Sequence, residues 1–290
     1  MRIVCLLPAA TEITCALGLR EALVGRSHEC DFPPSVSVLP ALTKARVDSS
    51  LPSGRLDDEV RRALAEGGPL YLLDDERLAS LAPDVIVTQA ACDVCAVSYE
   101  QVAEVARSAA PKAQVVCLLP TRLGDVLEDV RRVAAACAVS ERGDTLAADL
   151  QRRLDAAAGG ADGKTPRPAP RVAVVEWLDP PMLAGHWVPD VVAAAGGRPV
   201  GPAPGAPSPY ATWEEIEALA PDAVVVAPCG FDLERTKREA APFAARLHSF
   251  APRVLLMDGN AYLNRPGPRL AEAAEILAAW LAGSGGDTVL

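Results

Sequence analysis

The sequence is poor in aromatic residues, in basic charge and in long apolar runs, and each shortage excludes a class of protein. Phe, Trp and Tyr together make up 4% of 290 residues. The net charge of −10 leaves no surplus of basic side chains to neutralise nucleic-acid phosphates, so we expect no nucleic-acid partner. No window approaches the roughly 18 uninterrupted apolar residues of a membrane-spanning helix, so we expect no transmembrane segment.

The start of the sequence also lacks the pattern of a secretory signal. Met1 and Arg2 are followed by the short apolar run Ile3–Leu7 and then by Pro8. A signal peptide needs a longer apolar core and a cleavage site with small residues. This predicts a cytoplasmic protein, with a periplasmic or extracellular location as the alternative if the true start lies upstream.

Short apolar strands alternate with helical patterns along most of the chain, and half of the residues are hydrophobic. This alternation predicts an α/β fold with two three-layer lobes and parallel sheets. We expect an N-terminal lobe at residues 1–120, a helical connector and linker at 121–170, and a C-terminal lobe at 171–282. The helix that follows Ser140 is long enough to join two lobes.

An internal sequence repeat indicates that the two lobes are related. Residues 78–88 read Leu-Ala-Ser-Leu-Ala-Pro-Asp-Val-Ile-Val-Thr, and residues 216–226 read Ile-Glu-Ala-Leu-Ala-Pro-Asp-Ala-Val-Val-Val. Each segment predicts a helix end, a Pro-Asp turn and a strand. Two such halves facing each other would point the carboxyl ends of their strands into one cleft.

The stretch 171–189 shows what one side of that cleft would contain. We expect a buried strand at Val172–Val175 that stops before Glu176 and Trp177. His186 and Trp187 follow a few residues later. The carboxyl ends of strands in open α/β sheets are where ligands bind, so these side chains predict half of a ligand site.

Several ordered motifs resemble the periplasmic vitamin B12 (cobalamin) binding proteins of ABC transporters, within the superfamily of substrate-binding proteins with a helical backbone. The similarity runs from residue 2 to about residue 281. The motifs are Leu6–Glu12, Glu29–Pro34, Leu78–Thr88, Asp179–Gly185, Arg265–Arg269, and a branch pattern of Glu176–Pro181, Gly185–Trp187 and Asp258–Tyr262. The resemblance implies two α/β lobes bridged by one rigid helix, little hinge motion, and a ligand held between the lobes. The missing signal peptide is the main departure from the family pattern.

Aromatic and polar residues in the predicted strand-end loops form the candidate site. Aromatic faces suit the apolar rim of a flat macrocycle, because they give large contact area at low entropic cost. The aromatic candidates, with the imidazole beside them, are Phe32, Trp177, His186, Trp187, Phe231 and Tyr262. Polar candidates could bind the amide fringe of a corrinoid or an anionic group: Glu12, Glu29, Asp31, Glu176, Asp258, Asn260 and Arg265. The alternative is that Trp177 and Trp187 close the core of the second lobe, and that Glu12 favours a helix start.

Loop cysteines provide a second interpretation. Cys92 and Cys95 are two residues apart, and Cys30 and Cys229 lie in neighbouring predicted loops. Sulfur ligands of this kind bind zinc or an iron–sulfur cluster, or would meet a cobalt ion directly. A lone Cys-x-x-Cys pair is weak evidence, and it is also compatible with a redox pair.

These patterns lead to three hypotheses. The first is a binding protein, and not an enzyme, for cobalamin or a related corrinoid or metal chelate, with an ABC transporter as a possible partner. The alternative is a cytosolic metalloprotein or enzyme that uses the Cys and His loops. The third is an exported siderophore or heme binder. No Ser/His/Asp grouping, phosphate-binding glycine loop or assignable acid–base pair points to catalysis.

Overall fold

Buried apolar strands form the centre of each half of the chain. The computed structural model describes residues 1–67, 69–90, 99–157 and 168–283. It divides into two compact units. Unit 1 contains Met1–Leu51, Arg55–Pro120 and Asp125–Ala148, and unit 2 contains Pro52–Gly54, Thr121–Gly124 and Asp149–Leu290. The predicted boundaries of the lobes and of the connector stay a prediction.

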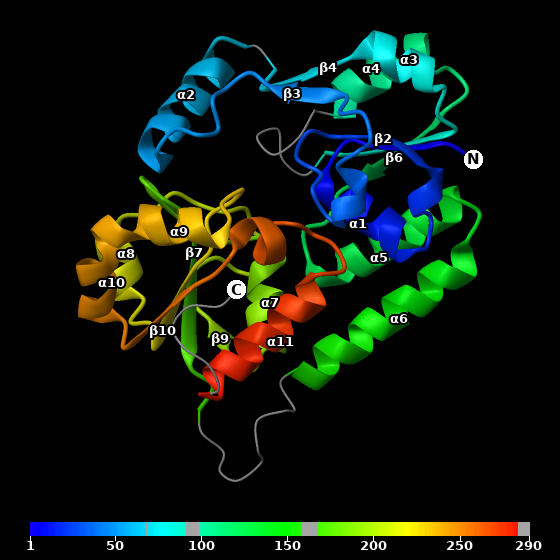
Figure 1. Ribbon diagram of the computed structural model, residues 1–290. Helices are drawn as coiled ribbons and strands as arrows, with labels where there is room; N and C mark the ends of the chain where they lie inside the picture. Colours follow the sequence, from blue (N-terminus) through cyan, green and yellow to red (C-terminus); the bar gives the residue numbers. More distant parts are fainter. Residues whose placement is uncertain (68, 91–98, 158–167, 284–290) are drawn as a thin grey trace. The chain divides into compact units, whose positions relative to one another are not determined.

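Unit 1 is organised around a sheet of four parallel strands in the order β2-β1-β5-β6 (Figure 1). The strands are β1 (Ile3–Cys5), β2 (Leu23–Arg26), β5 (Val85–Gln89) and β6 (Gln114–Leu118). A separate antiparallel pair joins β3 (Thr43–Ala45) to β4 (Tyr71–Leu73). The sequence patterns predicted the four parallel strands but not this pair.

Helices cover both faces of the first sheet. On one face, Val4 and Ile86 pack against Leu78 and Val102, and on the other Cys5 contacts Thr14. The helices in this part of the chain are α1 (Pro8–Ala16), α2 (Ser53–Ala65), which lies away from the sheet in Figure 1, α3 (Asp75–Leu81), α4 (Tyr99–Ala109), α5 (Leu123–Ala136) and α6 (Ser140–Ala157), which enters unit 2 at Asp149, with the short turns η1 (Arg20–Ala22) and η2 (Pro34–Val36). The predicted three-layer arrangement is therefore present in unit 1.

The first helix starts earlier than the sequence pattern suggested. We expected Thr11 to cap a helix that begins at Glu12, but α1 begins at Pro8, and Thr11 and Glu12 are buried inside it. Proline is favoured at the first position of a helix because it lacks an N–H group that would otherwise be unpaired there. Thr11 instead donates a hydrogen bond from its hydroxyl to Cys30 Sγ at 3.0 Å.

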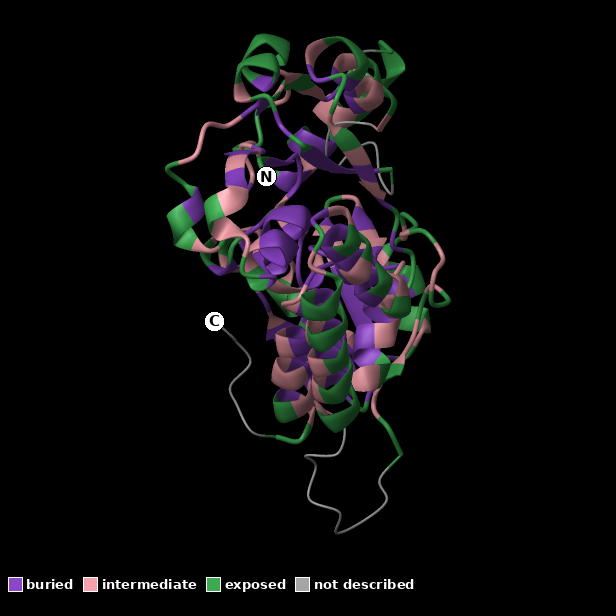
Figure 2. Cartoon of the chain, turned by 90° about the vertical axis from the view of Figure 1, so that its right-hand side faces the viewer, coloured by how far each residue is buried: buried purple, intermediate pink, exposed green. Residues whose placement is uncertain are grey.

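Unit 2 repeats this plan with a five-stranded sheet. The strands are β7 (Arg171–Leu178), β8 (Pro181–Leu183), β9 (Arg198–Pro199), β10 (Ala223–Val226) and β11 (Arg253–Leu256). The order β11-β10-β7 is parallel, and β7 shares its other edge between β8, which is antiparallel, and β9, which is parallel. The strands of both sheets are largely buried, whereas the helices expose one side (Figure 2).

The central strand of unit 2 is longer than expected. β7 continues through Glu176 and Trp177 to Leu178, whereas the apolar run predicted an end at Val175. The reason is a tight hairpin, in which Trp177 pairs with Met182 and Leu178 pairs with Pro181. This tertiary pairing supplies backbone partners that the local sequence does not reveal.

Helices also cover both faces of the second sheet. Ile216, Ala240 and Leu247 pack on the face of Val175 and Val226, while α7 and α11 lie on the other face (Figure 1). The helices are α7 (Val188–Ala194), α8 (Trp213–Ala218), α9 (Leu233–Ala240), α10 (Ala244–Phe250) and α11 (Leu270–Leu281), with the 3-10 turn η4 (Ala241–Phe243) and the π-helical turn η5 (Gly259–Leu263).

Two further expectations for this unit need correction. A single helix was predicted from Glu234 to Leu247, but η4 interrupts it at Pro242, because proline lacks the N–H that a continuous helix needs. The loop expected at 258–268 contains η5, which Asp258 caps by accepting a hydrogen bond from the backbone N–H of Ala261 at 2.7 Å.

Both units fasten the start of their central strand in the same way. In unit 1, Asp84 accepts the backbone N–H of Arg2 at 2.7 Å, and the Arg2 side chain donates to the carbonyl of Leu81. In unit 2, Asp222 accepts the backbone N–H of Arg171 at 2.7 Å, and the Arg171 side chain donates to the carbonyl of Ala220. We call each set the Arg–Asp lock. The sequence repeat at residues 78–88 and 216–226 therefore corresponds to a repeated structural element.

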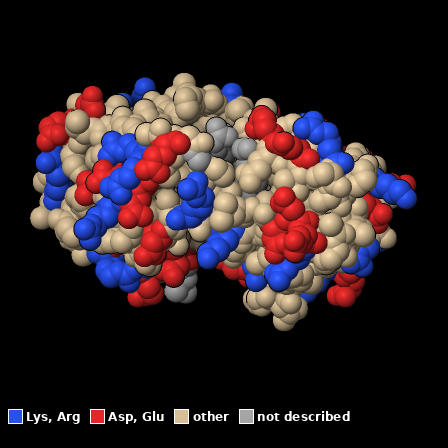
Figure 3. All heavy atoms as spheres, turned by 90° about the horizontal axis from the view of Figure 1, so that it is seen from above, with Lys and Arg blue, Asp and Glu red and all other residues tan. Residues whose placement is uncertain are grey.

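The surface carries charges of both signs. Acidic and basic side chains are interspersed on the face shown in Figure 3, and several form pairs one helical turn apart, such as Arg131 with Glu128 and Lys237 with Glu234. Exposed pairs of this kind contribute about 0.3–0.5 kcal/mol each. Among the described helices, none has the length and apolar character needed to cross a membrane.

Candidate functional site

The strand order of each sheet marks one edge as a place for ligands. In unit 1, β1 has β2 on one side and β5 on the other. In unit 2, β7 has β9 on one side and β10 on the other. The chain connections therefore leave the central strand in opposite directions, and ligands of open α/β sheets bind at the carboxyl ends beside such a strand. The predicted site residues follow these strand ends.

A hydroxyl and imidazole network lies at the carboxyl end of β2. Thr43 Oγ1 donates to Ser27 Oγ at 3.0 Å and accepts the backbone N–H of His28 at 3.0 Å. The same Thr43 oxygen lies 2.7 Å from Nδ1 of His28. Ser27 and Thr43 are both buried, and their network holds the Nδ1 side of the His28 ring.

The His28 ring also packs against an aromatic ring from β4. The ring centroids of His28 and Tyr71 are 5.7 Å apart with an interplanar angle of 43°. The Tyr71 hydroxyl donates to Glu29 Oε1 at 3.5 Å. Burial, with a smaller contribution from Arg26, lowers the pKa of His28 below its usual value. The imidazole is therefore neutral at physiological pH.

The remaining predicted residues of unit 1 differ in accessibility. Glu12 and Cys30 are buried, at 4% and 1% exposure. Asp31 and Phe32 are exposed, with Phe32 at 42%. Glu29 is half-buried. Of the predicted residues of this unit, Glu29, Asp31 and Phe32 are thus the ones that solvent or a ligand can reach most directly.

In unit 2, three side chains form a stack at the end of β7. Trp177 and Phe231 have ring centroids 5.1 Å apart at an interplanar angle of 53°. The Arg235 guanidinium lies 3.7 Å from the centroid of the Phe231 ring, within cation–π range. Phe231 is only 1% exposed, whereas Trp177 is half-buried. Phe231 therefore supports the Trp177 ring, and Trp177 offers the accessible aromatic surface.

Backbone hydrogen bonds join the loops after β7, β10 and β11. The N–H of Cys229 donates to the carbonyl of Glu176 at 2.9 Å, and the N–H of Asn260 donates to the carbonyl of Phe231 at 3.0 Å. Gly259 is required at the second junction, because a Cβ there would lie 2.2 Å from the carbonyl oxygen of Pro228. These bonds bring Glu176, Phe231 and Asn260 into one loop cluster.

Polar side chains continue this cluster. Arg265 is 5% exposed and donates from Nη2 to Asn260 Oδ1 at 2.8 Å. Burial raises the pKa of Asp258, and its bond to the N–H of Ala261 opposes that rise. The arrangement holds one guanidinium, one carboxylate and one amide in the segment that follows β11.

Tyr262 and Trp187 are tied to the same segment. The Arg269 guanidinium lies 4.9 Å from the centroid of the Tyr262 ring, and the Tyr262 hydroxyl donates to Glu272 Oε1 at 3.4 Å. Burial, with a smaller contribution from Glu272, raises the pKa of Tyr262. Trp187 Nε1 donates to the carbonyl of Leu263 at 2.8 Å. Both aromatic rings are half-buried.

His186 is held by its backbone. Its φ of 49° is in the left-handed region, which costs a non-glycine residue about 1–3 kcal/mol. The N–H of His186 donates to the carbonyl of Ala206 at 2.6 Å, and the carbonyl of His186 accepts the N–H of Gly205 at 2.9 Å. The ring lies 5.7 Å from the nearer Trp187 ring, and burial lowers its pKa.

The structure thus forms two separate groups of predicted residues, one in each unit. Unit 1 contains Glu12, Glu29, Cys30, Asp31 and Phe32, and unit 2 contains Glu176, Trp177, His186, Trp187, Phe231, Cys229, Asp258, Asn260, Tyr262 and Arg265. Cys92 and Cys95 lie outside the described residues. Among the residues that the structure does describe, no three His, Cys, Asp or Glu side chains converge as a metal site would require. Metal binding by the loop cysteines stays a prediction.

Sequence reasoning missed residues that shape both groups. Thr43 and Tyr71 are brought to His28 by the pairing of β3 with β4. Arg235 reaches Phe231 from α9. No local motif marks Thr43 or Tyr71, because their position depends on a pairing between distant segments. Arg235 follows the cap residue Asp232 by three positions, and that spacing would have placed it in the first turn of α9.

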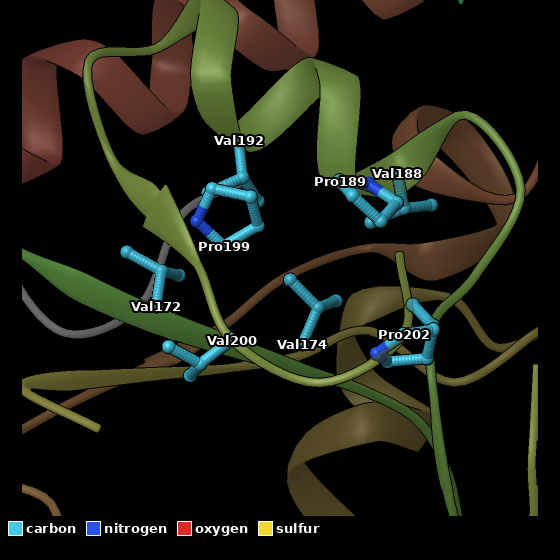
Figure 4. Close-up of a pocket in the computed structure, with 9 residues that line it drawn as sticks. Val172, Val174, Val188, Pro189, Val192, Pro199, Val200 and Pro202 are labelled. Atoms are coloured by element: carbon cyan, nitrogen blue, oxygen red, sulfur yellow. The ribbon is translucent and has the colours of Figure 1, made fainter. Parts of the chain in front are cut away.

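A small apolar hollow also lies in unit 2, away from the loop cluster. It holds about 200 Å³ of space, part of it open to solvent, between β7, β9 and α7. Figure 4 shows Val172, Val174, Val188 and Val192 around it, with Pro199 and Pro202 at its side. The hollow is at the amino half of β7 and offers no charged group, so it does not suit a polar macrocycle.

Comparison with known sequences finds one matching family. The family described as periplasmic binding protein matches residues 3–246. A search among curated proteins finds no match.

Solved structures of similar fold span nearly the whole chain. The periplasmic heme-binding protein RhuT from Roseiflexus sp. RS-1 has a TM-score of 0.70 and 23% identity, with 98% of each chain covered. The periplasmic vitamin B12 binding protein BtuF of Vibrio cholerae has a TM-score of 0.69 and 19% identity, covering 98% of this chain and 97% of that one. A periplasmic heme-binding protein from Pseudomonas aeruginosa has a TM-score of 0.73 and 18% identity, covering 98% and 94%. At these identities the likeness shows the fold.

Proposed function

Since the chain belongs to the periplasmic binding protein family, we propose that it binds cobalamin or a related corrinoid or metal chelate at the strand ends of its two units. The family consists of binding proteins, so the chain is a binding protein and not an enzyme. The observation that carries the proposal is the aromatic surface of unit 2. There the half-buried Trp177 rests on the fully buried Phe231, and Trp187 is fastened to the segment after β11.

The predicted site residues, taken over both units, suit a neutral, amide-bearing macrocycle. The predicted site residues include five carboxylates, on Glu12, Glu29, Asp31, Glu176 and Asp258, but only one guanidinium, on Arg265. Carboxylates accept hydrogen bonds from the amides of a corrin fringe, whereas they repel the carboxylates of heme. The charge balance therefore supports a corrinoid over heme.

Heme is the second candidate because two of the similar structures are heme-binding proteins. Arg265 and Arg269 lie in one segment and could pair with carboxylate groups of such a ligand. Parallel calorimetric titrations with cyanocobalamin and with hemin separate the two candidates. We expect tighter binding of cyanocobalamin. No heat with either compound at tens of micromolar protein would contradict the proposal.

The role of the aromatic surface can be tested with a matched pair of variants. Trp177→Ala should weaken cyanocobalamin binding about tenfold, because it removes an aromatic contact surface. Trp213→Ala removes the same side chain from α8, where it packs against Phe243 and away from the loop cluster. The control should bind as the wild type does. Equal weakening in both variants would show that Trp177 acts only through stability.

The alternative of a metalloprotein that uses Cys30, Cys92, Cys95 and Cys229 has its own test. Elemental analysis of protein purified without chelator would find a stoichiometric metal if those cysteines bind one. A folded, metal-free product with reduced cysteines would exclude this alternative. The result does not depend on whether cobalamin binds.

We further propose an ABC transporter as the partner that receives the ligand, because the family is one of periplasmic binding proteins. That description favours a periplasmic over a cytoplasmic location. Fractionation of a tagged product expressed from its native gene region decides between the two. Recovery in the cytoplasm alone would support the location predicted from the N-terminus and remove the transporter role.

A further inference from the structure

We propose that Nε2 of His28 is a ligand for the metal ion at the centre of the bound macrocycle, an inference that rests on the proposed function. Imidazole is among the commonest metal ligands in proteins, and it binds through one ring nitrogen while the other is fixed by a hydrogen bond. His28 has that arrangement in unit 1.

The hydrogen bonds around Thr43 assign the proton on the His28 ring. Thr43 has a single hydroxyl proton, which it donates to Ser27 Oγ. Its oxygen already accepts the backbone N–H of His28. With Thr43 donating to Ser27, the 2.7 Å contact with His28 Nδ1 is a hydrogen bond from Nδ1–H to Thr43. In this tautomer Nε2 carries the lone pair, and within the described residues it makes no hydrogen bond.

The surroundings keep this lone pair available. The buried Thr43 hydroxyl, which is itself bonded to Ser27, holds Nδ1, and the Tyr71 ring limits rotation from the side. His28 lies two residues beyond β2, at the edge of the sheet where ligands are expected.

The other two histidines lack this arrangement. No ring nitrogen of His186 or His248 makes a hydrogen bond within the described part of the chain, so neither tautomer is fixed. His186 is placed by its backbone and lies beside Trp187. His248 is in the last turn of α10. His248 serves as the matched control, because it is the one other histidine of the three in the sequence that lies outside the candidate site.

The proposal specifies the class of ligand, which must have an exchangeable axial position. In aquocobalamin, the cobalt–oxygen bond to water breaks and a cobalt–nitrogen bond to Nε2 forms. The water leaves with its electron pair, Nε2 supplies another pair, and the oxidation state is unchanged. In cyanocobalamin, the cyanide already occupies that position, so the same macrocycle can bind without ligation.

This pair of probes separates the inference from the proposed function. Wild-type protein should bind both compounds, but only aquocobalamin should show the absorbance shift of water replaced by imidazole. His28→Ala and His28→Gln should abolish that shift and weaken aquocobalamin binding about tenfold or more, while cyanocobalamin binding stays within about twofold. Retained cyanocobalamin binding also shows that the variants are folded. His248→Ala should keep the shift.

Two further variants test the role of Thr43 and of Tyr71. Thr43→Val removes the acceptor for Nδ1–H and should weaken aquocobalamin binding by about tenfold, the usual effect of losing such a support, whereas Thr43→Ser should retain it. Tyr71→Phe keeps the ring and should keep the shift.

Three outcomes would overturn the assignment. They are binding of both probes with no shift in the wild type, a shift that survives in His28→Ala, or a shift that is lost in Tyr71→Phe or His248→Ala. Failure of both probes to bind would instead contradict the proposed function.

Discussion

The two units share a scaffold but present different chemistry at their strand ends. Each has a central strand flanked by helices and fastened by an Arg–Asp lock, Arg2 with Asp84 in unit 1 and Arg171 with Asp222 in unit 2. The network at the end of β2 in unit 1 joins hydroxyls to an imidazole, whereas the stack at the end of β7 in unit 2 joins an indole to a phenyl ring and a guanidinium. The scaffold is thus repeated, and the strand-end contacts are not.

This difference explains why function cannot be read from the repeat itself. The repeated segments set the direction of the strands and hence the place of the site. The residues that would recognise a ligand lie just beyond the repeated segments, where the two units no longer resemble each other. Equivalent substitutions in the two scaffolds should therefore have similar effects on stability. Substitutions at the strand ends should have effects that differ between the units.

The largest difference between the units should come from a single methyl group. Gly259→Ala in unit 2 places a Cβ 2.2 Å from the Pro228 backbone carbonyl, which cannot move aside. Gly25→Ala in unit 1 meets the flexible side-chain ends of Leu42 and Leu81 at 2.4 and 2.8 Å. We expect losses of about 3 kcal/mol or more and about 1–2 kcal/mol respectively in urea unfolding. Equal losses would mean that the loops after β10 and β11 can separate.

The next effect concerns Asp129, a buried acid of unit 1. Asp129 in α5 is 1% exposed and pairs with Arg132. Burial raises the pKa of Asp129 from 3.8 to about 7, against the opposing effect of Arg132. Because this pKa is raised in the folded protein, stability is lost as the pH increases from about 4 to about 7.

Asp129→Asn should therefore be more stable than the wild type at pH 8, by up to about 4 kcal/mol for a rise of about three pKa units at 1.4 kcal/mol per unit, and similar to it at pH 4. Thermal unfolding across that range measures the difference. Glu128→Gln removes an exposed neighbour and should change little at either pH. In unit 2 the pH dependence has the opposite sign for Glu275. Its hydrogen bonds to Arg153 lower its pKa, so its contribution to stability is lost as the pH falls. A pH-independent Asp129→Asn effect would contradict the prediction.

The Arg–Asp locks should contribute similar amounts to the free energy of unfolding in the two units. Asp84→Ala and Asp222→Ala each remove the acceptor of a strand N–H at 2.7 Å, and each should cost about 1 kcal/mol. Asp84→Asn and Asp222→Asn keep an accepting oxygen and should cost less. Chemical unfolding gives all four values. A large loss of unfolding free energy in one unit and none in the other would show that the two locks share a geometry but do not contribute equally to stability.

The elements of the fold were largely predictable because their signals are local. The pattern predicted a strand at Gln114–Leu118, and β6 has those bounds. The expected strand at Val85–Thr88 is one residue shorter than β5. Errors arose where pairing with another segment decides the structure. β7 is extended by β8, and β3 with β4 has no signal in either segment alone.

The same distinction applies to the candidate site. Residues near predicted strand ends, such as Glu29 and Trp177, were found from their place in the sequence, whereas His28 was not among the predicted site residues. Thr43 and Tyr71 were not found, because the pairing of β3 with β4 carries them to His28. The tautomer of His28 depends on Thr43, so the metal-binding inference was beyond the reach of sequence patterns.

The smallest effects should come from the helix caps that precede β5 and β10. Asp74 caps α3 by accepting the N–H of Arg77 at 2.9 Å, and Thr212 caps α8 by accepting the N–H of Glu215 at 3.2 Å. Asp74→Ala and Thr212→Ala should each cost about 0.5–1 kcal/mol. Asp74 is charged and near the positive end of the helix dipole, so its cost should shrink in 1 M salt, while that of Thr212 should not. Equal salt dependence in the two variants would show that the charge of Asp74 contributes nothing, and that the equivalent caps of the two units act by hydrogen bonding alone.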